Sequence, residues 1–256
     1  MSENKEQFFQ RTEDKYVINE DQAEMFLEAC DAYIKKDLYY SYTVHSLYYD
    51  SPGNDLMIRG LEKPMYKTKI RLRSYGDPAE NSAVYIETKK KFGDIVYKRR
   101  LGMSAEEATD YLEYGIPHHL KNNTADEIEY LLNLYNPEAK ALILYDRTCY
   151  AAVSEKDVRI TFDRNIRYRT QSPDLYEKGN EKLLSPGTIV MEIKVSDRYP
   201  MWLCRVLTAM RLYRSSFSKY GTIYKNEICH GTDRIAVPEK QWIMNKESRK
   251  VCSLQY

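Results

Sequence analysis

Residues 66–75 alternate between cationic and mostly apolar side chains. The cations share one parity of the segment: Lys67, Lys69, Arg71 and Arg73. Successive side chains of a β-strand point to opposite faces, so the pattern predicts a strand with cations along one face, about 7 Å apart. A single strand of this kind is typical of an antiparallel sheet with one face in solvent.

The alternation of an apolar face and a charged face recurs along the chain. It is present in residues 84–91, 95–101, 142–150, 158–163 and 189–195. Segments 11–18 and 42–50 predict further strands. A sheet of this size tends to curl or close. With its apolar face outward under helices, the cations would lie inside, and a buried ring of positive charge is favourable only around a polyanion that neutralises it.

Periodic apolar positions and capping residues predict the helices. They are expected at 19–36, at 55–61, from Ser104 onward, at 126–135 and at 200–213. Ser104 followed by Glu107 forms a capping box, in which each side chain binds the other residue's backbone N–H. Residues 171–188, with two prolines and two glycines, are expected to form a loop. Strands and helices together predict one α+β domain.

Composition narrows the ligand class. The chain has 256 residues, 43% of them hydrophobic, which is enough for a packed core. With a formal net charge of +1, the chain has no overall positive potential that would attract nucleic acid. Its local groups of cations therefore indicate a specific anionic ligand. Five scattered cysteines without a Cys-x-x-Cys pair indicate a reducing, cytoplasmic location. No apolar run approaches the length of a membrane span.

Several well-known catalytic motifs are missing. The chain has no Gly-rich phosphate loop, no H-E-x-x-H and no G-x-S-x-G, and the neighbouring His118 and His119 have nothing nearby to complete a metal site. An enzyme of this sequence must therefore use lysine, arginine, glutamate and tyrosine. Phosphoryl transfer fits, because it depends on positioning and charge stabilisation. Glu87 and Glu192, on the charged parity, could hold a divalent metal or pair with arginines.

Short motifs follow one another in strand context. They are E-D-K-Y at Lys15, R-L-R at Arg71 and Arg73, E-T-K at Glu87 and Lys89, Y-D-R-T at Tyr145 and Arg147, V-R-I-T-F-D at Arg159, M-E-I-K at Glu192 and Lys194, and F-S-K-Y at Ser218 and Lys219, together with Lys98. In this order they resemble the catalytic domain of the vacuolar transporter chaperone (VTC) family of polyphosphate polymerases, within the CYTH-like triphosphate tunnel metalloenzymes. The resemblance covers residues 8–226 and leaves 227–256 as a C-terminal extension of unknown role.

The resemblance implies a closed eight-stranded antiparallel β tunnel with helices packed outside. It implies transfer of the γ-phosphate of ATP to an inorganic polyphosphate chain, with release of ADP. The phosphates would be gripped by Lys15, Arg71, Arg73, Lys89, Lys98, Arg147, Arg159, Lys194 and Lys219. Tyr145 and Ser218 would add hydrogen bonds, and Glu192 would hold Mn²⁺ or Mg²⁺. Lys67 and Lys69 are outside the motifs and are expected at a tunnel mouth.

Alternatives remain open at this point. Related tunnel triphosphatases and cyclases carry E-x-E-x-K near the N-terminus, where this chain has Arg11 in place of the first glutamate. This argues against a metal-dependent tripolyphosphatase without removing it. A non-catalytic polyphosphate-binding module would need the cations but not Glu192, and an ordinary sheet with a solvated charged face would need no anion. A membrane-protein partner is also left open, whereas nucleic acid is not expected.

The clustered cations predict that a polyanion stabilises the fold. A ligand that binds only the folded state adds RT ln(1 + [L]/Kd), about 2.7 kcal/mol at a hundred times Kd. Tripolyphosphate should therefore raise the melting temperature well above that measured in chloride of the same ionic strength. Equal melting temperatures in the two salts would favour the solvated sheet.

Overall fold

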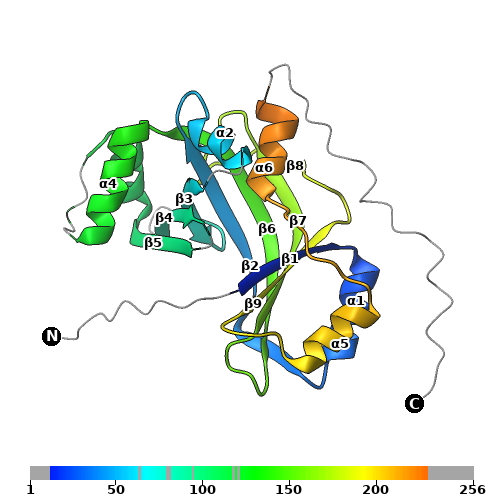
Figure 1. Ribbon diagram of the computed structural model, residues 1–256. Coiled ribbons are helices and arrows are strands. Elements are labelled where there is room, and N and C mark those ends of the chain that lie inside the picture. Colours follow the sequence, from blue (N-terminus) through cyan, green and yellow to red (C-terminus); the bar gives the residue numbers. More distant parts are fainter. Residues whose placement is uncertain are drawn as a thin grey trace, which may run out of the picture.

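The computed structural model describes residues 12–62, 65–78, 82–93, 95–116, 119 and 122–229. Within them a large, curled antiparallel sheet is flanked by helices (Figure 1). The strands are β1 (Thr12–Ile18), β2 (Ile34–Asp50), β3 (Tyr66–Tyr75), β4 (Ala83–Phe92), β5 (Ile95–Ser104), β6 (Glu138–Ala152), β7 (Arg159–Arg169), β8 (Lys182–Leu183) and β9 (Ile189–Val195). The helices are α1 (Glu20–Cys30), α2 (Asp55–Leu61), α3 (Ala105–Glu113), α4 (Asn123–Tyr135), α5 (Met201–Ala209) and α6 (Lys219–Ile223), followed by a π-helical turn, η1 (Tyr224–Ile228).

The strand order is β1-β9-β7-β6-β2-β3-β4-β5, with the short β8 paired to β7. The prediction of an α+β fold with an antiparallel sheet is confirmed. The prediction of eight strands closed into a tunnel is not, since the described sheet has nine strands and no described ladder joins β1 to β5. A side-chain ion pair lies where a closing ladder was expected, because Lys89 Nζ on β4 is 3.7 Å from Glu13 Oε1 on β1. The two ends of the sheet therefore curl toward each other.

The convex face of the sheet is apolar and carries two helical layers. Helices α1 and α5 cover β1, β7 and β9, with Phe26 and Leu203 fully buried in that core. Helices α3 and α4 cover β3, β4 and β5, with Ile128 fully buried. The side chains that these layers bury are the apolar parity of the alternating strands, so the predicted outward apolar face is confirmed.

Helix α6 is an exception, because it packs on the concave face. Its residues Tyr220 and Ile223 lie in one buried cluster with Val44 and Ile143, whose parity is that of the inward cations. The ring of Tyr220 stacks on that of Tyr48 at 4.7 Å between centroids. The concave face therefore has an apolar zone under α6 and a charged zone beyond it.

Some predicted boundaries were wrong where distant pairing overrides local periodicity. The helix expected at 19–36 ends at Cys30, since Ile34 pairs with Ala152 and enters the core under α1. The predicted loop at 171–188 contains β8, and the helix expected at 200–213 spans Met201–Ala209. The capping box at Ser104 is confirmed, with hydrogen bonds in both directions to Glu107.

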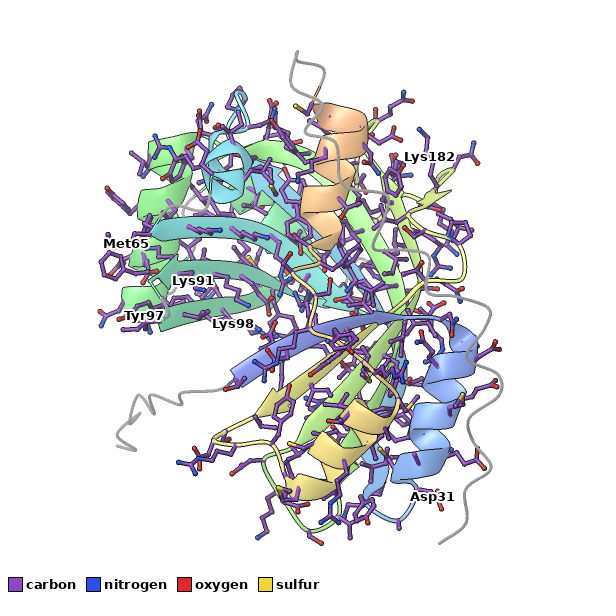
Figure 2. All side chains as sticks on the ribbon, turned by 45° about the vertical axis from the view of Figure 1, so that its right-hand side comes forward. Asp31, Met65, Lys91, Tyr97, Lys98 and Lys182 are labelled. Carbon is purple, nitrogen blue, oxygen red and sulfur yellow. The ribbon has the colours of Figure 1, made fainter. Side chains whose placement is uncertain are left out.

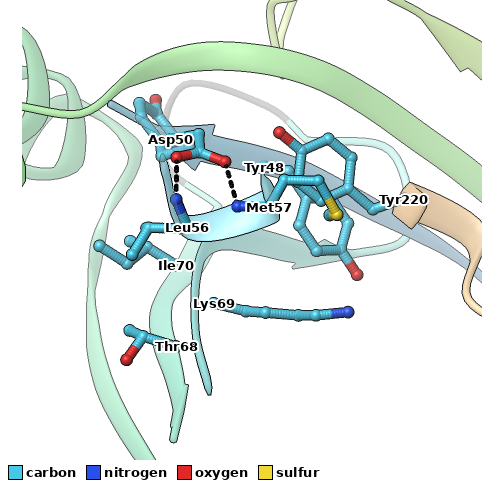
Figure 3. Close-up of a pocket in the computed structure, with 9 residues that line it drawn as sticks. Tyr48, Asp50, Leu56, Met57, Thr68, Lys69, Ile70 and Tyr220 are labelled. Carbon is cyan, nitrogen blue, oxygen red and sulfur yellow. Dashed lines mark hydrogen bonds between the residues drawn. The ribbon is translucent and has the colours of Figure 1, made fainter. Parts of the chain in front are cut away.

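Asp50 fixes the turn from β2 into α2. Its side chain is fully buried and accepts backbone hydrogen bonds from Ser51 at 2.8 Å and from Leu56 and Met57 at 2.9 Å (Figure 3). The N–H groups of Leu56 and Met57 belong to the first turn of α2, where no backbone carbonyl is available to accept from them, and that of Ser51 lies in the turn before it. One carboxylate thus caps the helix from inside the core.

Asp50→Ala should lower the free energy of unfolding by about 3 kcal/mol, because it leaves three buried backbone donors without an acceptor. Urea denaturation followed by circular dichroism measures this change. Asp55→Ala is the matched control: that carboxylate is exposed and accepts from the Ser51 hydroxyl, so its removal should cost about 1 kcal/mol or less. Equal losses in both variants would contradict the capping role of Asp50.

Candidate functional site

The inward parity of the strands forms a continuous cationic surface, which we call the basic face. It consists of Lys15 on β1, Lys69, Arg71 and Arg73 on β3, Lys89 on β4, Lys98 and Arg100 on β5, Arg147 on β6, Arg159 on β7 and Lys194 on β9. Cross-strand pairing opposes many of these cations to carboxylates. Lys15 faces Glu192, Arg71 faces Glu87, and Arg147 faces Asp163.

One cross-strand row contains lysines only. Lys69, Lys89 and Lys98 are direct neighbours on β3, β4 and β5. They line a pocket together with Tyr48, Arg71, Glu87 and Thr88. In Figure 2, Lys98 lies on the β4–β5 hairpin, with β1 passing below it. Like charges directly opposite each other destabilise a sheet, and carboxylates from other rows offset only part of this repulsion, since Lys98 pairs with Glu87 and Lys89 with Glu13.

Glu87 is the anion at the centre of the neighbouring row. Its carboxylate is 2% exposed and accepts from Arg71 Nε at 2.8 Å, from Arg100 Nε at 2.8 Å and from Lys98 Nζ at 3.0 Å. Burial acts to raise the pKa of Glu87, but Arg71, Arg73 and Lys98 hold it well below its usual range. Arg71 and Lys98 are thereby fixed in place on the wall of the pocket.

Asp163 organises a second cluster at the other side of the basic face. It is fully buried and accepts from Arg147 Nε and from Lys219 Nζ, both at 2.6 Å. Both cations also lie over the ring of Tyr145, at 5.2 and 4.4 Å from its centroid. The Tyr145 hydroxyl accepts from Arg73 Nη2 at 3.2 Å and so connects this cluster to β3.

Glu192 and Glu13 form the third carboxylate group. Lys194 Nζ is 2.6 Å from Glu192 Oε1 and 4.0 Å from Glu13 Oε2. Glu13 also lies 3.9 Å from Lys15 and 3.7 Å from Lys89. No group of three or more His, Cys, Asp or Glu side chains in the described ranges could hold a metal by itself. A divalent ion at Glu192 would need phosphate oxygens and water as its other ligands, an arrangement that suits magnesium.

The other predicted site residues lie at the edges of these clusters. Arg159 pairs with Asp37 at 3.0 Å and has a side chain 46% exposed, which places it at the rim. Ser218 precedes α6, where its hydroxyl accepts from Gly221 N and from Lys69 Nζ at 3.3 Å. Arg11 and His118 are outside the described residues.

Sequence reasoning missed Lys69 and Tyr48. Lys69 was expected at a tunnel mouth, but it lies in the pocket, where its extended side chain runs beside the stacked rings of Tyr48 and Tyr220 (Figure 3). Burial lowers the pKa of Lys69, and Lys15 and Lys89 lower it further. The parity shared with Arg71 was the available signal for Lys69.

Tyr48 has an ionisation equilibrium unlike that of an ordinary tyrosine. Its hydroxyl accepts from Arg71 Nη1 at 3.2 Å. Burial alone would raise the pKa of Tyr48, but Arg71, Lys69 and Arg73 bring it down to about 7. The sequence contained no signal for this residue, because its position opposite Arg71 depends on the register of β2 with β3. Asp163 and Arg100 were missed for the same reason.

Known proteins resemble this chain in sequence and in fold. The model of the VTC domain family matches residues 10–227. A protein from Bacillus halodurans named a “putative adenylate cyclase” has a similar structure, with a TM-score of 0.52 and 10% identity over 80% of this chain and 92% of its own. A “putative adenylate cyclase” from Vibrio parahaemolyticus gives 0.44 and 14% over 85% and 99%. No curated protein matches the sequence. Across the described helices, none combines the length and apolarity needed to cross a membrane.

The carboxylates of the site predict acid sensitivity. The pKa values of Glu87, Asp163 and Glu192 are held below their unfolded values of about 4.3 for Glu and 3.9 for Asp, although burial opposes this. Their contribution to stability is therefore complete above about pH 5 and is lost as the pH falls toward the folded-state values. The free energy of unfolding, measured with urea from pH 6 to pH 3, should fall steeply below about pH 4.5.

Glu87→Gln tests the assignment of this acid sensitivity to the site. The variant should be less stable at pH 7, because the cations around Glu87 lose their anion. Below pH 4.5 its stability should fall less steeply than that of the wild type, by up to about 1.4 kcal/mol per pH unit, since one titrating group is absent. Identical slopes would show that Glu87 does not carry the effect.

Proposed function

The chain belongs to the VTC domain family, and from this membership and the basic face we propose that it is an ATP-dependent polyphosphate polymerase. The family and the fold support an enzyme of the phosphate-transfer type. In the proposed reaction a terminal oxygen of a bound polyphosphate chain attacks the γ-phosphorus of ATP. One phosphorus–oxygen bond forms, the bond to the β-phosphate oxygen breaks, and ADP leaves. ATP and inorganic polyphosphate are the proposed partners.

The observation that carries the proposal is the all-lysine row on β3, β4 and β5. Lys69, Lys89 and Lys98 are adjacent and share one pocket with Arg71. Carboxylates of other rows offset part of this charge, since Lys98 lies 3.0 Å from Glu87 and Lys89 lies 3.7 Å from Glu13. Within the described residues, Lys69 donates only to the neutral Ser218 hydroxyl, at 3.3 Å. A chain of phosphates carries negative charge along its whole length and so can offset the repulsion among several neighbouring lysines at once. A single small anion could reach only part of the row.

The residues of the basic face have separate roles in this reaction. Arg71 and Lys98 would hold phosphates near the reacting centre, while Glu87 fixes their positions from behind. Lys219, held by Asp163, would bind from the opposite side. The transition state of phosphoryl transfer spreads charge over the equatorial oxygens, and fixed cations stabilise it without having to reorganise.

The site fits a divalent cation that takes most of its ligands from the substrate. Glu192 is 7% exposed, and Glu13 lies near the same Lys194 ammonium group. Mn²⁺ or Mg²⁺ bound there would neutralise phosphate charge. Lys194 also holds the Glu192 carboxylate in position and so orients the oxygen that would bind the metal.

A metal-dependent tripolyphosphatase is the second candidate. Glu13, the second glutamate of the E-x-E-x-K pattern, and Glu192 both approach Lys194, so two carboxylates lie together although Arg11 replaces the first glutamate. Hydrolysis would use water as the acceptor in place of a polyphosphate end. A polyphosphate-binding module without activity would need the basic face but no Glu192.

The decisive experiment incubates the purified protein with ATP and Mn²⁺ and follows the products by phosphorus NMR. We expect chains of phosphoanhydride together with ADP. Glu192→Gln should abolish synthesis, whereas the matched control Glu138→Gln should not, because Glu138 also pairs with a lysine at 2.6 Å but lies outside the site.

Arg71→Ala should lower turnover at least about 100-fold, and Arg164→Ala, which breaks a surface ion pair with Glu20, should have little effect.

Other outcomes select the alternatives. Orthophosphate released from added tripolyphosphate, with no chain growth from ATP, would establish the hydrolase. Binding of tripolyphosphate without either reaction would leave the binding module. Equal activity in Glu192→Gln and the wild type would contradict the assigned role of Glu192.

A further inference from the structure

Three tyrosines extend the basic face at one end. Tyr42 on β2, Tyr75 on β3 and Tyr85 on β4 have the same parity as the inward cations, and we call them the tyrosine cluster. The Tyr75 ring meets the edges or faces of the other two at 5.7 and 5.9 Å between centroids. Tyr75 is 40% exposed, so part of its ring is available to a ligand.

Arg100 connects the tyrosine cluster to the phosphate-binding pocket. Its guanidinium group lies 4.7 Å from the centroid of Tyr85 and 5.7 Å from that of Tyr75. The group donates to the Tyr75 hydroxyl at 2.7 Å and, through Nε, to Glu87 at 2.8 Å. Lys98 binds the same Glu87 oxygen at 3.0 Å. One guanidinium group therefore separates the aromatic ring from the cations that line the pocket.

Gly102 allows Tyr85 to adopt this position. The two residues face each other across β4 and β5. A Cβ atom at Gly102 would lie 3.3 Å from Cε1 of the Tyr85 ring, closer than ordinary van der Waals contact. The missing side chain thus lets the ring lie across β5 and under Arg100. The aromatic surface is held in place by packing before any ligand arrives.

The opposite ends of the same strands are different in character. There Lys67 and Lys91 are direct cross-strand neighbours, and α6 fills the adjacent part of the concave face with apolar side chains. A phosphate chain can run toward the lysines, whereas the rings near α6, Tyr48 and Tyr220, already stack on each other and Tyr220 is buried. The basic face therefore has a direction, with an exposed aromatic ring and a guanidinium plane at one end and lysines at the other.

We propose that the tyrosine cluster and Arg100 bind the base of the nucleoside triphosphate donor, an inference that rests on the proposed function. With the triphosphate over Lys98 and its neighbours, the base lies against the exposed part of Tyr75 and the guanidinium of Arg100. Aromatic rings and arginine planes both stack on nucleobases. The growing chain, which has no base, then lies toward Lys67 and Lys91.

The test compares two ligands that share phosphates but differ in the base. Calorimetry measures the affinities of inorganic tripolyphosphate and of an ATP analogue with a non-cleavable β–γ bridge. Tyr75→Ala should weaken the binding of the analogue about tenfold, the loss of one base–aromatic stack, and that of tripolyphosphate less than twofold. Tyr75→Phe keeps the ring and should retain most of the affinity for the analogue.

Tyr130→Ala is the matched control, since this tyrosine is 61% exposed on α4, away from the basic face, and should change neither affinity. Equal weakening of both ligands by Tyr75→Ala, or weakening of neither, would overturn the proposal. Should Tyr75→Ala not fold, Tyr75→Leu fills more of the lost volume and carries the same expectation. Because binding is measured without turnover, the absence of polymerase activity would contradict the proposed function but not this site.

Discussion

The fold must accommodate many cations on one face of a curled sheet even when no anionic ligand is bound. The rest of the structure depends on this constraint. Each cation lowers the stability of its neighbours, and the low dielectric of a concave surface strengthens the repulsion. The register of the sheet reduces this repulsion, because it places carboxylates directly opposite cations, as in the pairs Arg71–Glu87 and Arg147–Asp163. Breaking such a buried pair leaves an uncompensated charge, so each carboxylate stabilises the fold as well as the site.

The arrangement of the helices follows from the same constraint. Because the cations occupy the concave face, the apolar parity must face outward, where α1 and α5 cover one part and α3 and α4 the other. Helix α6 packs inside, on the apolar zone that the cations leave free, where Met57 of α2 joins the same buried cluster. It brings Lys219 to Asp163 and Ser218 to Lys69, so the element that closes one end of the concave face also contributes to the binding surface.

The alternation of side chains along each strand predicted much of this arrangement. The contacts that it missed depend on the register between neighbouring strands. Alternation identified the strands and placed Arg71, Arg147 and Lys194 on one face. It could not show that Glu87 binds several cations at once, since that depends on how β3, β4 and β5 align. Asp163 acquires its role from a lysine 56 positions away, and the end of α1 at Cys30 is set by pairing between β2 and β6. Sheet closure is not confirmed in the described residues, and alternation could not have tested it, because alternation describes the faces of a sheet and carries no information about its edges.

The internal carboxylates also determine how tightly an anion is held. A phosphate that approaches Arg71 or Arg147 exchanges an existing ion pair for a new one, so the gain in free energy is only the difference between the two. In the row of Lys69, Lys89 and Lys98, Lys98 pairs with Glu87 and Lys89 with Glu13, whereas Lys69 donates to the neutral Ser218 hydroxyl. A phosphate at Lys69 therefore adds an ion pair without exchanging one. An anion should therefore gain more net free energy at Lys69 than at the paired arginines, where it replaces a carboxylate that is already bound.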